Sequence, residues 1–240
     1  MSVRIDPRDI EAYQKHLNSG HGVSIPPSDT WIAEHARAIL LHSAGIGAQA
    51  HARLAEAFPR DLNRILQSNP FQLYTETDLV TFEQAVALYR RCETPNQASL
   101  ASAAILKVLF DEARSGNLFC EGRLATQRAR AISTIPLEQI DAAYRAMLAR
   151  SEIIEFPVDS IHRIMLGRHA REEKRLADLI LRRRQARLLP ISCSEAEITQ
   201  ALIRAGCTTP DRSQIAAVRT ALANPNSLIT GGPGSGKTSI

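Results

Sequence analysis

The sequence has few cysteines, and their spacing does not suggest a metal or disulfide site. Cys92, Cys120, Cys193 and Cys207 lie far apart, and no C-x-x-C pair occurs among them. Zinc sites and the disulfide frameworks of small secreted domains use closer or paired spacings. We therefore expect reduced thiols, which are typical of a cytoplasmic protein.

Aromatic residues and long apolar runs are also scarce. Aromatic side chains make up 5% of the 240 residues, whereas alanine is common, and this composition favours helices over sheets. No apolar run approaches the length of a membrane span, and residues 1–7 lack the apolar core of a signal peptide. The sequence therefore predicts a mainly α-helical protein without a membrane partner.

The net charge of +4 is small, but it is unevenly distributed. Residues 162–187 carry nine lysines and arginines against three acidic residues, so their excess of six exceeds the charge of the whole chain. Arg168, Arg171, Arg175 and Arg182 recur there at helical spacing on one face. Such a stripe suits either a nucleic-acid backbone or the solvated face of a helix that connects two domains.

Glycine, proline and polar clusters divide the chain into segments with different patterns. Most segments have the periodicity of helices, and the best strand candidate is residues 152–156, just before Pro157. Helices followed by one short strand suit a winged-helix-like unit, and one long basic helix is expected from 161 to 189. The five predicted segments are residues 1–28 (N-terminal), 29–92 (helix-hairpin-helix), 93–158 (winged-helix-like), 159–192 (basic connecting helix) and 193–240 (nucleotide-binding).

The tripeptide Gly45-Ile46-Gly47 joins two predicted helices. Glycines permit the tight turn of a helix-hairpin-helix, and this turn exposes backbone N–H groups at the start of its second helix. Those donors suit a DNA phosphate and would bind it independently of base sequence. An ordinary connection between helices also uses glycine, so the tripeptide alone leaves both interpretations open.

Residues 231–238, GGPGSGKT, match the Walker A pattern G-x-x-x-x-G-K-[ST]. In this pattern the glycine-rich backbone surrounds nucleotide phosphates, Lys237 reaches the outer phosphates and Thr238 can hold Mg²⁺. Residues 226–230 predict the strand that precedes such a loop. The candidate nucleotide-binding residues are Gly231, Gly232, Pro233, Gly234, Ser235, Gly236, Lys237 and Thr238.

Gln214 is a second candidate for nucleotide binding. It follows Pro210-Asp211-Arg212-Ser213 and opens a predicted helix over residues 215–222. A glutamine amide presents a donor and an acceptor together, which matches the edge of adenine. Its place ahead of a Walker A loop makes Gln214 the candidate adenine contact, with ATP and Mg²⁺ as the expected cofactors.

Together these motifs resemble RecD-like DNA helicases of superfamily one, in the longer branch with helix-hairpin-helix repeats ahead of the motor. Residues 211–214 (DRSQ) and 228–238 (LITGGPGSGKT) resemble the Q motif and motif I of that family. Residues 44–47 with Arg53-Leu54, and residues 69–73 (NPFQL), resemble its first hairpin and the segment after it. The resemblance implies a mainly α fold, in which a helix-hairpin-helix and winged-helix-like N-terminal region precedes the start of a P-loop, RecA-like α/β motor domain.

The resemblance also implies roles for individual residues. Gln214 would contact adenine, while Lys237 on the phosphates and Thr238 on Mg²⁺ would be the catalytic pair; Gly45, Ile46 and Gly47 would contact DNA. The sequence departs from the family at the second hairpin, where Leu79-Val80-Thr81 replaces Gly-Ile-Gly. We expect this turn to pack against the core without binding phosphate. His51 also replaces a small residue in the first hairpin.

The function implied by the resemblance is that of an ATP-dependent helicase in DNA repair and recombination, moving 5′ to 3′ along single-stranded DNA. Single-stranded or forked DNA would be its partner, and a single-strand DNA-binding protein is a further candidate. The family's acidic Mg²⁺-binding motif, its phosphate-sensing arginine and its second motor domain do not occur in these 240 residues, so we expect no activity from this chain alone. The alternative is a non-catalytic module that binds DNA or docks a protein.

Overall fold

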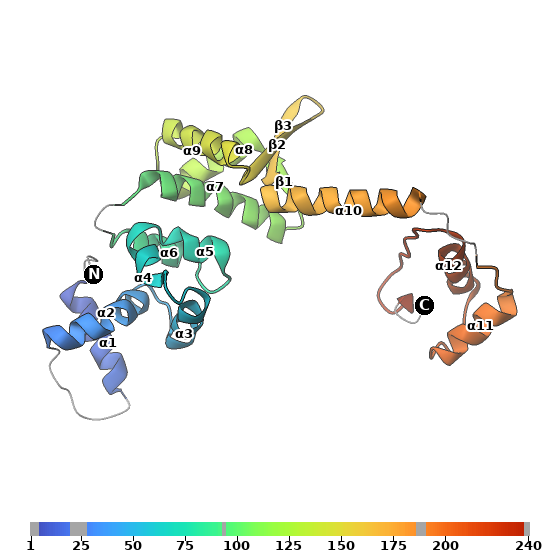
Figure 1. The fold of residues 1–240 in the computed structure, drawn as a ribbon, viewed down its shortest axis with the longest axis horizontal. Helices are drawn as coiled ribbons and strands as arrows, with labels where there is room; N and C mark the ends of the chain where they lie inside the picture. Colours follow the sequence, from blue (N-terminus) through green and yellow to red (C-terminus); the bar gives the residue numbers. More distant parts are fainter. Residues whose placement is uncertain (1–4, 20–27, 93–94, 186–190, 238–240) are drawn as a thin grey trace. The chain divides into compact units, whose positions relative to one another are not determined.

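The computed structural model describes residues 5–19, 28–92, 95–185 and 191–237 (Figure 1). The chain divides into two compact units, Met1–His169 and Ala170–Ile240. The division falls within helix α10 (Gly167–Gln185), whose first residues belong to the first unit.

The N-terminal part of the first unit consists of short helices whose boundaries follow from local sequence signals. Ser28 caps the second helix by accepting a hydrogen bond from the Trp31 N–H, 3.2 Å away. Gly45 ends that helix, and Asn69-Pro70 separates the fourth from the fifth. The helices are α1 (Pro7–Asn18), α2 (Asp29–Ser43), α3 (Ala48–Ala57), α4 (Leu62–Ser68), α5 (Phe71–Glu76) and α6 (Phe82–Tyr89).

Helix α7 (Gln97–Arg114) is central to the first unit and packs against α8 (Gly122–Ser133) and α9 (Leu137–Ala149). Its apolar middle is buried, including Ala104 and Ile105, which are both 0% exposed. One continuous hydrophobic core extends from α2 to the last strand of this unit, so the two predicted N-terminal regions share a core. The buried helix predicted over residues 98–115 is confirmed.

A small antiparallel sheet completes the first unit. Its strands are β1 (Phe119–Glu121), β2 (Ile153–Val158) and β3 (Ile161–Leu166), in the order β1-β3-β2. Asp159 and Ser160 form the two-residue turn between β2 and β3 with φ of 51° and 65°, as a type I′ hairpin requires. The strand predicted at 152–156 is confirmed as β2, and the winged-helix-like unit expected around it stays a prediction.

The expected helical start at residue 161 is wrong. Ile161–Leu166 is the central strand of the sheet, and helix α10 begins only at Gly167. The backbone carbonyl oxygen of Ser151 lies 2.1 Å from where a Cβ on Gly167 would be, so only glycine fits at this change from strand to helix. Ile164 and Leu166 are buried in the shared core, and this long-range packing outweighs the helical charge pattern of the residues that follow.

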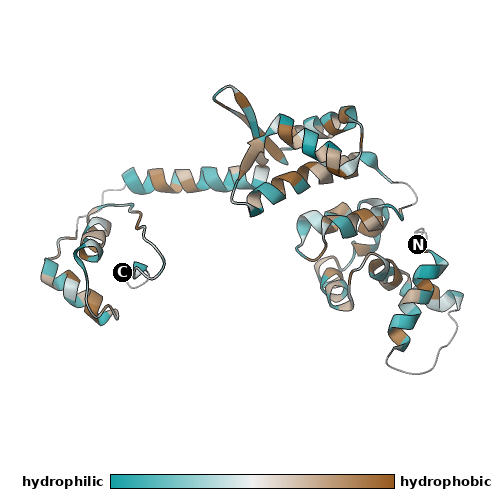
Figure 2. Ribbon diagram, turned by 180° about the vertical axis from the view of Figure 1, so that it is seen from behind, coloured by the Kyte–Doolittle hydropathy of each residue, from teal (hydrophilic) through white to brown (hydrophobic). Residues whose placement is uncertain are grey.

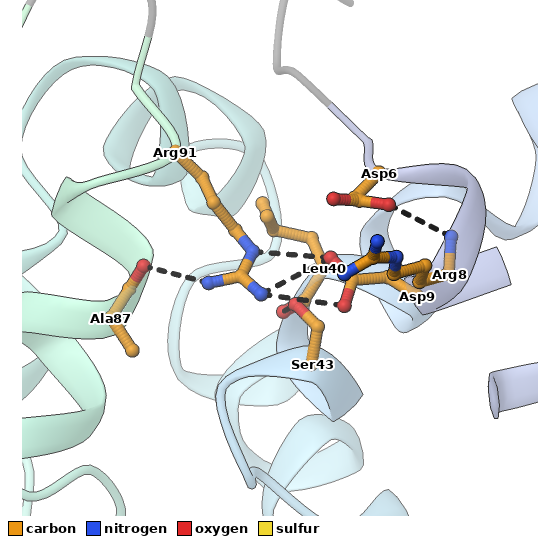
Figure 3. Close-up of polar contacts among 7 residues, drawn as sticks. All are labelled: Asp6, Arg8, Asp9, Leu40, Ser43, Ala87 and Arg91. Atoms are coloured by element: carbon orange, nitrogen blue, oxygen red, sulfur yellow. Dashed lines mark hydrogen bonds and ion pairs between the residues drawn. The ribbon is translucent and has the colours of Figure 1, made fainter.

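Helix α1 is joined to the rest of the first unit by an ion pair (Figure 3). The guanidinium of Arg91, just after α6, donates to both carboxylate oxygens of Asp9, with its shortest contact at 3.1 Å. Arg91 also donates to the carbonyl oxygen of Ala87. Because α1 buries no residue of its own, this polar contact and its packing on α2 are what hold it in place.

The second unit contains most of α10, followed by α11 (Glu195–Arg204) and α12 (Arg212–Ala223). Its hydrophobic core is small and consists of Ile198, Leu202 and Ile215, with Cys193, Cys207 and Val218 packed around it. Along α10, Figure 2 shows hydrophobic bands between hydrophilic ones. Leu176, at 59% exposed, is the most exposed large apolar residue of this helix.

The α/β motor start that the sequence predicts is not evident in the second unit. Residues 226–230 do not form the predicted strand, and Leu228 in their middle is 88% exposed. A strand needs a neighbouring strand to satisfy its backbone groups, and residues 170–185 and 191–237 contain none. The described fold is therefore mainly helical with one small sheet. None of its helices has both the length and the apolar character needed to cross a bilayer.

Candidate nucleic-acid interface

The turn at Gly45-Ile46-Gly47 has a defined backbone geometry. Gly45 has φ of +77°, which favours glycine, and its N–H donates to the carbonyl oxygen of His42 at 2.8 Å. The Ile46 N–H donates to the carbonyl oxygen of Leu41 at 2.9 Å, which completes a Schellman motif at the end of α2. The Ile46 side chain is 3% exposed and anchors the turn in the core.

Helix α3 begins immediately after this turn with exposed donors. Gly47 is its N-cap with no side-chain hydrogen bond, and the first turn of the helix carries no acidic residue. Gly47, Ala48 and Gln49 are exposed to solvent. The first N–H groups of a helix have no partner within the helix, and its dipole places partial positive charge there. This end of α3 can therefore accept an anion such as a phosphate.

Arg37 brings positive charge close to α3. Its Nε donates to the His51 Nε2 at 3.1 Å, so the guanidinium of an α2 residue contacts the first turn of α3. Burial lowers the pKa of His51, and the neighbouring Arg37 charge lowers it further. At neutral pH His51 is thus an uncharged acceptor that orients Arg37. His51 is larger than the small residue expected at its position, yet α2 and α3 are still in contact.

The second turn, at Leu79-Val80-Thr81, is different. Thr81 and Gln84 form a capping box, in which the Gln84 N–H bonds to the Thr81 hydroxyl and the Thr81 N–H bonds to the Gln84 amide oxygen. Glu83 adds negative charge to the first turn of α6, and Val80 is 4% exposed in the core. The side chains of Thr81 and Gln84 thus occupy the backbone N–H donors that would otherwise be free to hold a phosphate. That this turn packs without binding phosphate stays a prediction.

Gln84 also connects the two turns. Its Nε2 donates to the carbonyl oxygen of Gly45 at 2.8 Å, across 39 residues of sequence. Sequence reasoning identified neither this contact nor Arg37 as part of the site. The Thr81-x-x-Gln84 spacing could have indicated the capping box, but no local pattern indicates the bond to Gly45.

In the second unit, the structure brings Gln214 next to the glycine-rich loop. Asp211, Ser213 and Gln214 form the capped start of α12, and the Gln214 Nε2 lies 3.5 Å from the carbonyl oxygen of Ser235. A Cβ on Gly236, which has φ of +73°, would lie 2.7 Å from the Gln214 Nε2. Two motifs that are 21 residues apart in sequence therefore lie next to each other.

The loop itself is closed around Lys237. The Lys237 Nζ donates to the carbonyl oxygens of Gly231 at 2.7 Å and Gly232 at 2.6 Å. The Ser235 hydroxyl also donates to the Gly232 carbonyl oxygen, at 2.9 Å. A phosphate would have to draw the ammonium group away from these oxygens. Thr238, the candidate Mg²⁺ ligand, lies outside the described residues.

The basic residues of α10 remain a solvated stripe. Beyond Gly167 the helix buries no described residue, and Arg171, Arg175 and Arg182 are exposed. Arg168 differs, because its guanidinium lies 5.0 Å from the centre of the Phe110 ring. The stripe itself does not decide between a nucleic-acid contact and a connecting helix.

Comparison with known families adds one finding. Residues 33–119 match the model for the ATP-dependent RecD2 DNA helicase HHH domain. The match extends from α2 through α7 into β1, and it includes both turns and Arg37. No curated protein matches the chain. The chain thus contains a RecD2-type helix-hairpin-helix domain, as its sequence motifs predicted.

Proposed function

We propose that this chain, with a RecD2-type helix-hairpin-helix domain at residues 33–119, is the DNA-binding N-terminal region of a RecD-like DNA helicase. The observation that carries the proposal is the exposed, uncapped start of α3 behind the turn at Gly45. Backbone donors at such a helix start suit a phosphate and carry no base information. Binding is therefore independent of sequence and falls steeply with salt.

Arg37 and the α3 donors act on the same phosphate in this proposal. The His51 contact uses only the Nε of Arg37, which leaves the terminal nitrogens of its guanidinium for a phosphate oxygen. Arg53, on the exposed surface of α3, adds a second positive charge. The second turn does not contact the DNA in this proposal. Thr81 and Gln84 occupy the backbone donors at the start of α6, and the Glu83 carboxylate repels a phosphate there.

We further propose that residues 231–238 bind the phosphates of ATP with Mg²⁺. Lys237 would move from the Gly231 and Gly232 carbonyl oxygens to the outer phosphates, Thr238 would hold Mg²⁺, and Gln214 would contact adenine. The closeness of Gln214 to Ser235 and Gly236 supports a shared nucleotide site. In the full helicase, ATP hydrolysis would drive movement 5′ to 3′ along single-stranded DNA. These 240 residues alone are expected to give no steady ATP turnover.

One substitution tests the DNA site directly. Gly47 has open space around it and an ordinary φ of −72°, so an aspartate fits and caps α3. Gly47→Asp should preserve or increase stability, because the cap is favourable, yet weaken DNA binding at least tenfold because its carboxylate occupies the phosphate position. Gly47→Ala, which adds neither cap nor charge, should bind within about twofold of the natural protein. Fluorescence anisotropy with forked and single-stranded DNA at low salt measures both.

A second variant controls for charge alone. Ser194 is the N-cap of α11, and Ser194→Asp places the same added charge at a helix start in the second unit. It should leave DNA binding unchanged. Equal losses for Ser194→Asp and Gly47→Asp would contradict a specific site at α3. Failure of the natural protein to bind any DNA at low salt would overturn the whole proposal.

A non-catalytic DNA-binding or protein-docking module is the second candidate. The observation in its favour is that residues 224–237 form no strand of an α/β motor. The two candidates differ in nucleotide binding. Titration with a fluorescent ATP analogue and Mg²⁺, compared with Lys237→Ala, should show binding that the variant loses if the loop is a nucleotide site. Equal or absent binding in both proteins favours the module.

A further inference from the structure

Helix α10 has a contiguous apolar patch that is exposed to solvent. Leu176, Leu179 and Ile180 are 59%, 49% and 45% exposed, although leucine and isoleucine are among the residues most often buried. Their spacing of three and four residues places them on one side of the helix, and the equally exposed Leu181 lies off this side. A patch of this kind, on a helix that buries only Gly167, is typical of a docking surface.

Charged residues flank the patch, and their signs differ at its two ends. Glu172 and Glu173 lie about one helical turn before it, and Arg183 and Arg184 lie about one turn after it. All four are exposed, and within the part of the chain that the structure describes none of them makes an ion pair. The acidic and basic ends are about 16 Å apart along the helix, so they cannot pair within one copy. The α10 face therefore consists of Glu172, Glu173, Leu176, Leu179, Ile180, Arg183 and Arg184.

The α10 face is complementary to itself when two copies of the helix pack antiparallel. If the two helices cross level with residue 178, Leu176 lies level with Ile180 of the second copy, and the apolar patches meet. Glu172 and Glu173 then face Arg183 and Arg184 of the second copy, and the same contacts recur at the other end. Such a pairing is isologous, with one two-fold axis. A parallel pairing would instead place acid against acid and arginine against arginine.

The neighbouring residues of the second unit leave the α10 face open. The Asn226 Nδ2 donates to the carbonyl oxygen of Ile180 at 3.0 Å, but this contact uses the backbone and leaves the Ile180 side chain 45% exposed. The basic stripe of Arg171, Arg175 and Arg182 lies beside the face by helical spacing. A second helix on the α10 face therefore need not displace any described element.

We propose that the α10 face pairs antiparallel with the same face of a second copy, so that the chain forms a symmetric dimer. The apolar patches supply the affinity, and the flanking charges set the direction of the pairing. The contact involves about four helical turns of each copy, which is less than a standard interface of about 1,600 Å² provides. The dimer is therefore weak, with a dissociation constant of about 10–100 µM. The inference is independent of the proposed DNA and nucleotide binding.

The test uses analytical ultracentrifugation of the full chain from about 1 µM to about 1 mM, where a monomer–dimer equilibrium is expected. Glu172→Arg with Glu173→Arg makes both ends of the α10 face basic, and Arg183→Glu with Arg184→Glu makes both ends acidic. Each double variant alone should associate about tenfold more weakly, because like charges then meet at both ends. An equimolar mixture of the two should form a heterodimer, because every acidic end then meets a basic end.

The mixture distinguishes lost pairing from misfolding, since a misfolded variant does not recover when its counterpart is added. Lys174→Glu changes an exposed charge on the side of α10 opposite Leu176, so it should leave the equilibrium unchanged. Leu179→Gln removes part of the apolar patch without a change of charge, and it should weaken association about tenfold. Circular dichroism checks that each variant keeps its helix content.

Three results would overturn the inference. A natural chain that stays monomeric at about 1 mM leaves the α10 face to a different partner. Association that both double variants retain at natural strength excludes the antiparallel pairing. Double variants that are weakened alone and stay monomeric when mixed exclude it as well. The Gly47→Asp comparison tests DNA binding separately, so either proposal can fail without the other.

Discussion

Gln84 donates a hydrogen bond from its Nε2 to the carbonyl oxygen of Gly45, 2.8 Å away. The same side chain accepts from the Thr81 N–H through its amide oxygen at 2.9 Å. One glutamine thus closes the capping box of α6 and fixes the backbone of the first turn. The second turn thus supports the first one structurally.

Replacement of Gln84 should affect both stability and DNA binding. Gln84→Ala removes the Gly45 contact and half of the capping box, so we expect a loss of about 1–2 kcal/mol in the free energy of unfolding. DNA affinity should fall several-fold because the Gly45 turn is less well held. Urea denaturation and anisotropy measure the two effects. Gln67→Ala on α4, where the structure describes no side-chain bond, should change neither; a Gln84→Ala protein with natural stability would contradict the bridging role.

Gly45 and Gly47 should respond differently to alanine. Gly45 has φ of +77°, a region in which a Cβ is unfavourable, so Gly45→Ala should cost about 1–2 kcal/mol. Gly47 has φ of −72° and nothing within 4 Å of an added Cβ, so Gly47→Ala introduces no strain. Because alanine is a poorer N-cap than glycine but restricts the unfolded chain, the two effects oppose each other and the net change should stay below about 1 kcal/mol. Chemical denaturation of the two variants measures the difference. If Gly45→Ala and Gly47→Ala lowered the free energy of unfolding by the same amount, the turn would not depend on the positive φ of Gly45.

Local sequence patterns predicted many of the helices and turns, but the strands depend on pairing partners that lie far away in the sequence. The Gly45-Ile46-Gly47 turn and the buried helix through Ile105 each have a signal within a few residues, and both are confirmed. Strand β3 was missed because its basic continuation has a helical charge pattern, while its pairing partners lie far away in sequence. The strand predicted at 226–230 is absent for the related reason that an apolar run forms a strand only beside another strand.

The candidate-site residues also divide into those with a local sequence signal and those whose position depends on distant contacts. Gln214 and the loop at Gly236 were identified from motif spacing, and the structure brings them together, although nucleotide binding stays a prediction. Arg37 could not be identified because its contact is with His51, which belongs to another helix.

Glu112 should make stability depend on acidic pH. Hydrogen bonds from Asn117 at 3.0 Å and from Arg128 of α8 hold the pKa of Glu112 below its ordinary value of 4.5. A depressed folded-state pKa stabilises the fold above the unfolded pKa, and this contribution disappears as the pH falls through the folded value. Melting temperature should therefore drop as pH decreases below about 4.5.

The control for this pH effect is Glu112→Gln, which keeps the shape without the charge. Its melting temperature should be lower than that of the natural protein at pH 7, and the gap should narrow toward pH 3. Glu138→Gln, at the start of α9 and without an ion pair in the described structure, should not flatten the profile in this way. A gap that stays constant from pH 7 to pH 3 would exclude Glu112 as the titrating group.

Asp9 and Arg91 should control the docking of α1. Their side chains are 20% and 27% exposed, and α1 has no buried residue, so only its packing on α2 would hold it if the pair were lost. Asp9→Asn weakens the bonds to the guanidinium, so local opening of α1 should become easier by about 1–2 kcal/mol, with allowance for partial screening by solvent. Hydrogen exchange should accelerate over residues 7–18, whereas residues 97–114 of α7 should exchange as before. Glu11→Gln, which removes another carboxylate of α1, serves as the control. The exchanged pair, Asp9→Arg with Arg91→Asp, should recover part of the protection, and no recovery would mean that geometry at this site matters more than charge.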